Sequence, residues 1–158
     1  MATRDYTIWN AAGRPFRRPP WLVEMRALAR RYGVAFLGDL GNEPHLRAVR
    51  PEDHTPFSHT EWPVSISEYV INAIDLGKGP HGDRILADAR AGRLPWLKYM
   101  NHRGRNYSRK RDNFATGSPS GDDHLHLSGM SNHTRTGLNG YDPFPSAAAR
   151  GRRAGTLQ

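Results

Sequence analysis

Histidine and aspartate dominate the three short stretches of this sequence that could do chemistry. The stretch "DHLHLS" (residues 123–128) places His124 and His126 two positions apart in an alternating apolar and polar pattern. Alternation with period two predicts a β-strand that carries both imidazoles on one face. Two imidazoles on one face can both bind a metal ion, or one can bind it while the other transfers a proton. The alternative is the exposed polar face of an edge strand.

Asp75 and His54 could complete such a site. Asp75 ends the apolar run "YVINAID" (residues 69–75), where an unpaired carboxylate is costly to bury. A metal ion or another cation would remove that cost, and the alternative is an aspartate that caps the turn at residues 77–79. His54 lies in the loop "PEDHTPFS" and is either a ligand or a solvated residue. Together the stretches supply two histidines and one carboxylate, with one histidine left over, as a hydrolytic zinc site requires.

The composition indicates one domain with a modest core. The chain has 158 residues, of which 37% are hydrophobic, and its mean hydropathy is −0.75. Its 16 glycines and 12 prolines favour a turn-rich fold over a helical bundle. Cysteine is absent, which excludes disulfides, thiolate metal sites and a cysteine nucleophile. No apolar run has the length of a signal-peptide core or a membrane span, so we expect synthesis in the cytoplasm and no membrane association.

The elements that must position these side chains follow from local patterns. We expect helices over residues 19–33 and 82–92, the second capped by Asp83, and strands over 68–79, 94–104 and 123–129. The fold class is then α+β: a small antiparallel sheet that carries the site, flanked by short helices and long loops. We expect a flexible basic segment over residues 1–18, one domain over 19–144 and a disordered basic tail over 145–158.

The net charge of +8 and the pI near 10.4 indicate an anionic partner, either nucleic acid or the anionic polymers of a bacterial wall. Residues 103–121 read as a basic loop with five cations between positions 103 and 111. A nucleic-acid-binding protein or a metal nuclease is therefore the competing hypothesis. The scattered cations and the absence of interleaved aromatic residues argue against it.

The order of these motifs resembles the D-alanyl-D-alanine carboxypeptidase-like zinc peptidases, which are related to lysostaphin-type endopeptidases and the hedgehog domain. The likeness is greatest to a branch found in actinobacteria and their phages, which includes endolysin domains, and it covers about residues 21–128. The segments that carry it are Gly38-Asp39, His45, "DHTP" (53–56), "AIDL" (73–76), "NHR" (101–103) and "DHLHLS".

The resemblance implies a role for each matching residue. His54, Asp75 and His126 match the zinc ligands, and His124 would be the general base. The remaining matches are His45, Arg47 and Asn101 as substrate-binding residues, and Arg50 or Arg103 as the cation that stabilises the oxyanion.

The sequence departs from the family pattern in its spacing and in its base. His54 and Asp75 lie 21 positions apart, which is long for the family, so His59 could replace His54 as ligand. Asp123 stands where many relatives have a glutamate base, and a shorter Asp123 could act as that base or orient His124.

The activity that the resemblance implies is zinc-dependent hydrolysis of an amide bond in peptidoglycan stem peptides or cross-bridges. The protein would be an endopeptidase or a D,D-carboxypeptidase that acts at the cell wall once released or delivered. A second alternative is a peptidase fold kept as a catalytically inactive structural module.

Overall fold

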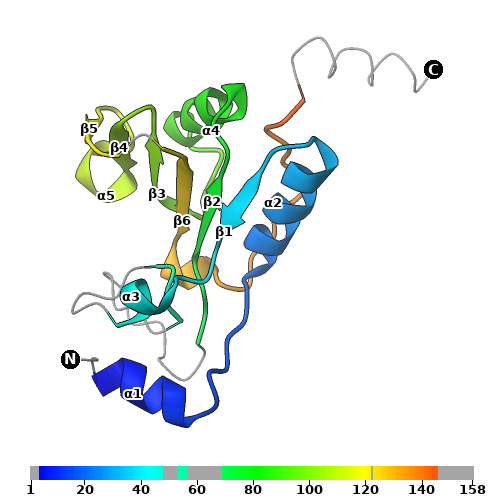
Figure 1. Cartoon of the computed structure of the whole chain (residues 1–158). Helices are drawn as coiled ribbons and strands as arrows, with labels where there is room; N and C mark the ends of the chain where they lie inside the picture. Colours follow the sequence, from blue (N-terminus) through cyan, green and yellow to red (C-terminus); the bar gives the residue numbers. More distant parts are fainter. Residues whose placement is uncertain (1–3, 48–52, 57–68, 122, 146–158) are drawn as a thin grey trace.

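The computed structural model describes residues 4–47, 53–56, 69–121 and 123–145 (Figure 1). In these ranges it contains five α-helices, six β-strands and a short 3-10 helix at Ser131–His133. The helices are α1 (Arg4–Ala11), α2 (Pro20–Arg31), α3 (Glu43–Leu46), α4 (Pro80–Arg90) and α5 (Arg109–Asp112). The strands are β1 (Phe36–Gly38), β2 (Ala73–Leu76), β3 (Leu97–His102), β4 (Arg105–Ser108), β5 (Ser118–Pro119) and β6 (Leu125–Gly129).

The six strands form one antiparallel sheet in the order β1-β2-β6-β3-β4-β5. This confirms the expected α+β class and the antiparallel sheet. The strand that carries "HLHLS" is not an edge strand, because β6 pairs with β2 on one side and with β3 on the other. An exposed polar edge therefore does not explain its two histidines.

Helices α2 and α4 cover the apolar face of the sheet. Pro20 begins α2, where a missing backbone N–H costs nothing, and the helix turns Trp21, Leu22 and Met25 into the core. The indole of Trp21 stacks on that of Trp96 with ring centroids 4.5 Å apart. The strand residues that meet these helices are Ile74, Leu76, Met100, Leu125 and Leu127. One face of each of these strands thus packs into the core, as the alternation in "HLHLS" predicted for β6.

The opposite face carries a row of polar residues that are directly paired across five strands. The row, called here the polar row, consists of Asp75, His126, Asn101, Asn106 and Ser118. Residues that oppose each other in antiparallel strands share a face of the sheet. Side chains from distant parts of the chain therefore lie in line across the sheet.

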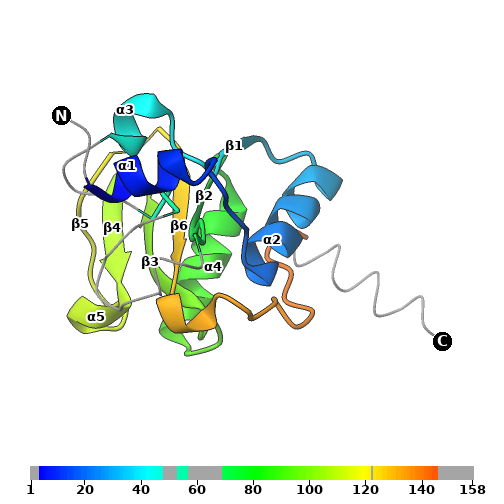
Figure 2. The ribbon, with the colours of Figure 1, turned by 90° about the horizontal axis from the view of Figure 1, so that it is seen from below.

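The expectations for residues 1–18 and 103–121 were wrong. Part of the expected flexible segment 1–18 is helix α1, because Tyr6 and Trp9 are buried in a small cluster with Leu46 of α3. Both views of the fold show α1 and α3 side by side, apart from α2 and α4 (Figures 1 and 2). The expected basic loop 103–121 contains β4, α5 and β5. The expected tail lies, beyond residue 145, outside the described residues.

Candidate metal centre

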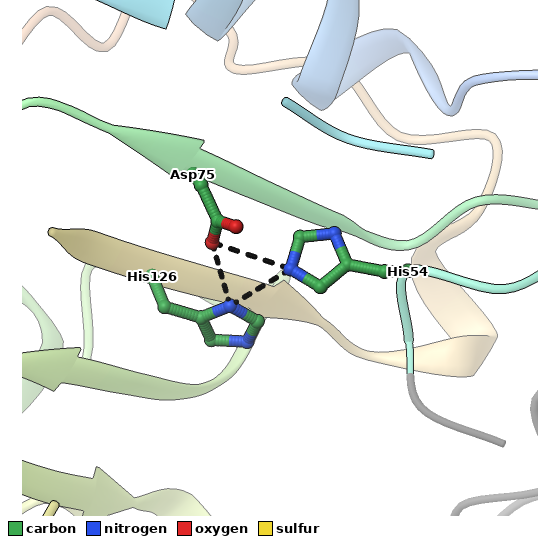
Figure 3. A group of neighbouring side chains, drawn as sticks. All are labelled: His54, Asp75 and His126. Atoms are coloured by element: carbon green, nitrogen blue, oxygen red, sulfur yellow. Dashed lines mark hydrogen bonds and ion pairs between the residues drawn. The ribbon is translucent and has the colours of Figure 1, made fainter. Parts of the chain in front are cut away.

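Three side chains from separate parts of the chain converge at one point (Figure 3). Asp75 comes from β2, His126 from the neighbouring β6, and His54 from the turn at residues 53–56. His54 Nε2 lies 3.1 Å from His126 Nδ1 and 3.2 Å from Asp75 Oδ1, and His126 Nδ1 lies 2.9 Å from the same oxygen. The three donor atoms therefore form a nearly equilateral triangle. We call these residues the metal group.

The hydrogen bonds behind the metal group determine which atoms face its centre. His54 Nδ1 lies 2.7 Å from the backbone carbonyl of Asp39, and a carbonyl can only accept, so Nδ1 carries the proton. In the neutral ring, His54 Nε2 is then a bare lone pair that faces a carboxylate oxygen of Asp75. Two acceptors at 3.2 Å repel each other unless a proton or a metal cation lies between them.

The geometry and chemistry of the donors fit a metal ion. Nitrogen and oxygen ligands at about 2.0–2.1 Å from a tetrahedral zinc lie about 3.3 Å from one another, slightly more than the separations found here. His126 Nε2 lies 2.8 Å from Ser128 Oγ and 3.2 Å from the hydroxyl of Tyr99, which hold the ring so that Nδ1 faces the group. The metal group can thus bind a metal ion with an inner set of two imidazoles and one carboxylate.

Asp75 takes part in this group and does not cap the following turn. Burial raises the pKa of Asp75, but its close contacts with the imidazoles of His126 and His54 outweigh burial and hold that pKa well below its ordinary value. The carboxylate is therefore charged and ready to bind a cation. Asp75 is thus one of three residues whose side chains could hold a metal ion.

His124 borders the metal group on its more exposed side. His124 Nε2 lies 3.2 Å from Asp75 Oδ1, and Nδ1 lies 2.8 Å from Asp123 Oδ1. The His124 side chain is 30% exposed, whereas that of Asp123 is 83% exposed. A partly accessible imidazole held between two carboxylates is suited to proton transfer. The pattern "DHLH" predicted this closeness from the shared strand face.

A buried ion pair, which was not predicted from the sequence, holds the His54 turn against the sheet. Lys98 Nζ pairs with the carboxylate of Asp53, and both residues are buried. A register shift between Leu97 and Tyr99 places Lys98 in a bulge of β3, outside the regular alternation. The Asp53 carbonyl also accepts a hydrogen bond from the backbone N–H of Asn72. The single lysine between apolar residues in "WLKYM" could have indicated a buried cation that needs a carboxylate partner.

The backbone of Asp39, which binds His54, is itself anchored. The Asp39 carboxylate pairs with the guanidinium of Arg18, and Asp39 is buried. Gly41 N–H donates to the carbonyl of His54 at 3.0 Å. The segment between β1 and α3 thus positions the first ligand from two sides. Gly38-Asp39 is one of the segments that carry the family resemblance, but the resemblance implies no role for the Asp39 carbonyl.

His45 lies on α3 and Arg47 directly follows this helix, and both bind groups other than the metal group. His45 Nδ1 lies 2.7 Å from Asn42 Oδ1, and Arg47 Nε donates to Glu43 at 3.1 Å. Both residues are exposed. Within the described part of the chain, neither residue forms a hydrogen bond or ion pair with the three ligands. Arg50 and His59 lie outside the described residues.

Asn101 lies beside the site, whereas Arg103 does not. Asn101 directly opposes His126 across β3 and β6. Arg103 occupies the β3–β4 turn, where its positive φ of 50° is unusual for a non-glycine residue. Its guanidinium donates to both carboxylate oxygens of Asp83 on α4, at 3.0 and 2.8 Å. Asp83 therefore does not cap α4 as expected, because it binds Arg103 and the buried His102.

Several cations of the expected basic loop bind the protein's own carbonyl groups. Arg109 donates to the carbonyls of Leu97 and Leu94, and burial lowers the pKa of Arg109. Arg111 donates to the carbonyls of Asn106 and Thr116, both at 2.8 Å. These arginines hold α5 and the adjoining loop to the sheet. They are less available to an anionic polymer than the sequence indicated.

Comparisons with known proteins add no relative: no family model, no curated protein and no solved structure matches the chain. Within the described ranges, none of the helices combines the length and the apolar character needed to cross a membrane. The family resemblance of the motifs therefore stays a prediction.

Proposed function

We propose that this protein is a zinc-dependent hydrolase that cleaves an amide bond in peptidoglycan peptides. The observation that carries the proposal is the metal group of His54, Asp75 and His126, with His124 beside it. Two histidines and one carboxylate are the donor set of catalytic zinc sites that leave a position open for water. Such sites differ from structural ones, which are closed by four protein ligands, usually including cysteine.

Zinc bound there would supply a Lewis acid and lower the pKa of a water molecule toward neutrality. The protein's own residues would then handle the proton. His124 Nε2, next to Asp75, would accept it from the attacking water and deliver it to the leaving amine. Asp123, bound to His124 Nδ1, would hold the ring in that orientation and stabilise its charged form. Asp123 is then the orienting residue and His124 the base.

The stabilisation of the oxyanion cannot rest on Arg103 as the structure places it, because Asp83 binds that guanidinium. Tyr99 is a better candidate among the described residues. Its hydroxyl lies 3.2 Å from His126 Nε2, on the same face of the sheet as the metal group. A phenol in that place can donate a hydrogen bond to developing negative charge. Arg50 keeps its proposed role from the sequence.

The choice of a peptide substrate rests on the motif order described in the sequence, with a wall peptide as the substrate class. The internal use of Arg109 and Arg111 weakens the competing hypothesis of a nuclease, because phosphate binding requires accessible cations. We expect the protein to act at the cell wall once released or delivered.

Hydrolysis of purified peptidoglycan tests the proposal. Zinc-loaded protein should release new amino groups, and mass spectrometry of the soluble products should locate the cleaved amide. The control is His124→Gln, which should retain zinc and lose this activity. Cleavage of single- or double-stranded nucleic acid with intact peptidoglycan would refute the peptidase proposal, and inertness of the zinc-loaded protein toward both would favour the inactive module.

A further inference from the structure

Away from the metal group, side chains of the polar row and Arg111 are linked by hydrogen bonds in which each residue donates to the next one toward the metal group. At the far side of the row lies Arg111, whose guanidinium can only donate. Arg111 Nη1 lies 3.4 Å from Asn106 Oδ1 and 3.2 Å from Ser118 Oγ, and Nη2 donates to the backbone carbonyl of Asn106 at 2.8 Å. The Asn106 side chain therefore turns its oxygen toward Arg111 and its NH₂ group away from it.

The orientation of Asn106 determines that of Asn101. Asn106 Nδ2 donates to Asn101 Oδ1 at 2.7 Å. A side-chain amide has its oxygen on one side and its NH₂ group on the other, so Asn101 must present NH₂ elsewhere. No hydrogen bond of this NH₂ group is found among the described residues. Asn101 is only half-buried, and it directly opposes the ligand His126.

We propose that Arg111 and Asn106 are positioning residues that make Asn101 a hydrogen-bond donor, and that this donor binds an acceptor oxygen of the substrate beside the metal group. The acceptor is a carboxylate or a peptide carbonyl. The family resemblance implies only that Asn101 contacts substrate, whereas the direction of its amide follows from the bonds to Asn106. This inference rests on the proposed function for the ligand being a peptide.

The opposite orientation of the Asn101 amide would reverse which ligand groups the site prefers. If Asn101 presented its oxygen, the site would favour an ammonium or an amide N–H of the ligand. Replacing Asn106 with aspartate should produce that reversal, because a carboxylate has no N–H to donate. Asn101 would then turn its NH₂ group toward the new carboxylate and its oxygen toward the ligand. A carboxylate oxygen of the new aspartate would still accept a hydrogen bond from Arg111, so the fold should be retained.

Side-chain NMR of the ¹⁵N-labelled full-length protein tests this inference. The NH₂ resonance of Asn101 is identified by its absence in Asn101→Asp. It should shift saturably with N-acetyl-D-alanine, which offers a carboxylate, and with N-acetyl-D-alaninamide if carbonyls also bind, but not with methylammonium chloride. Asn106→Asp should weaken the affinity for N-acetyl-D-alanine about tenfold, the upper range for one hydrogen bond. The control Asn113→Asp adds the same charge on an exposed residue after α5 and should leave the affinity unchanged.

Titrations with EDTA and with zinc separate this inference from the proposed function. A saturable shift in EDTA that Asn106→Asp weakens supports the donor site even if peptidoglycan is not hydrolysed. The inference is overturned if the Asn101 resonance does not respond to either acetylated probe in either condition. It is also overturned if Asn106→Asp binds N-acetyl-D-alanine as tightly as the wild type does.

Discussion

Replacing Lys98 with methionine should leave the carboxylate of Asp53 buried without its ammonium partner. The two residues are 6% and 4% exposed, so water cannot replace the lost ion pair. Breaking a buried pair from one side typically costs about 3–5 kcal/mol of unfolding free energy. Because native domains have about 5–15 kcal/mol in total, we expect Lys98→Met to be folded but strongly destabilised.

The matching double variant separates the charge effect from lost packing. Asp53→Asn removes the second charge with almost no change in shape, so Lys98→Met combined with Asp53→Asn should recover about 2 kcal/mol or more relative to Lys98→Met alone. Urea unfolding followed by circular dichroism, with EDTA present, measures all four proteins. Since Asp53 precedes the ligand His54, Lys98→Met should also weaken zinc binding.

Simple addition of the effects of the two substitutions would contradict this prediction, because a buried ion pair requires coupling between them. A loss of less than about 1 kcal/mol of unfolding free energy in Lys98→Met, the value typical of a surface pair, would contradict it as well.

Three further substitutions probe other parts of the structure. His124→Gln should retain zinc and lower kcat for wall-peptide hydrolysis by about 10²–10⁴-fold, measured by amine release, and loss of zinc would instead make His124 a ligand. Arg103→Gln should leave kcat within about twofold of the wild type, since Asp83 holds that side chain away from the metal group, and a larger fall would restore its role at the oxyanion. Gly82→Ala should lower the unfolding free energy by about 1–3 kcal/mol, because the new Cβ would lie 2.4 Å from His102 Cε1, and unchanged stability in urea would show that the ring can move aside.

The sequence predicted those features that depend on short-range periodicity. Alternation along "HLHLS" predicted that the leucines of β6 face the core and that His126 faces the other side. Asp75 was predicted only as the end of a buried strand, and its pairing with His126 is seen in the structure alone. The helical spacing from Pro20 to Arg31 likewise predicted α2. The spacing of Tyr6 and Trp9 was a usable signal for α1, but the many nearby arginines led to the expectation of a flexible segment.

The sequence could not show with which residue each charged side chain forms an ion pair or hydrogen bond. Lys98 and Asp53 are 45 positions apart, and only the bulge in β3 brings them together. The binding of Arg103 to Asp83 depends on how α4 lies against the β3–β4 turn, which no local pattern encodes. The direction of the Asn101 amide likewise depends on Arg111, which belonged to an expected loop.

The metal content of the purified protein tests whether His54, Asp75 and His126 form a metal centre. Elemental analysis should find about one zinc per chain in the wild type and almost none in Asp75→Ala, because this variant removes the only carboxylate of the metal group. Asp83→Ala is the matched control, since it removes a carboxylate from a different cluster and should retain the zinc. Absence of bound metal from the wild type, or equal zinc in wild type and Asp75→Ala, would contradict the assignment of His54, Asp75 and His126 as a metal centre.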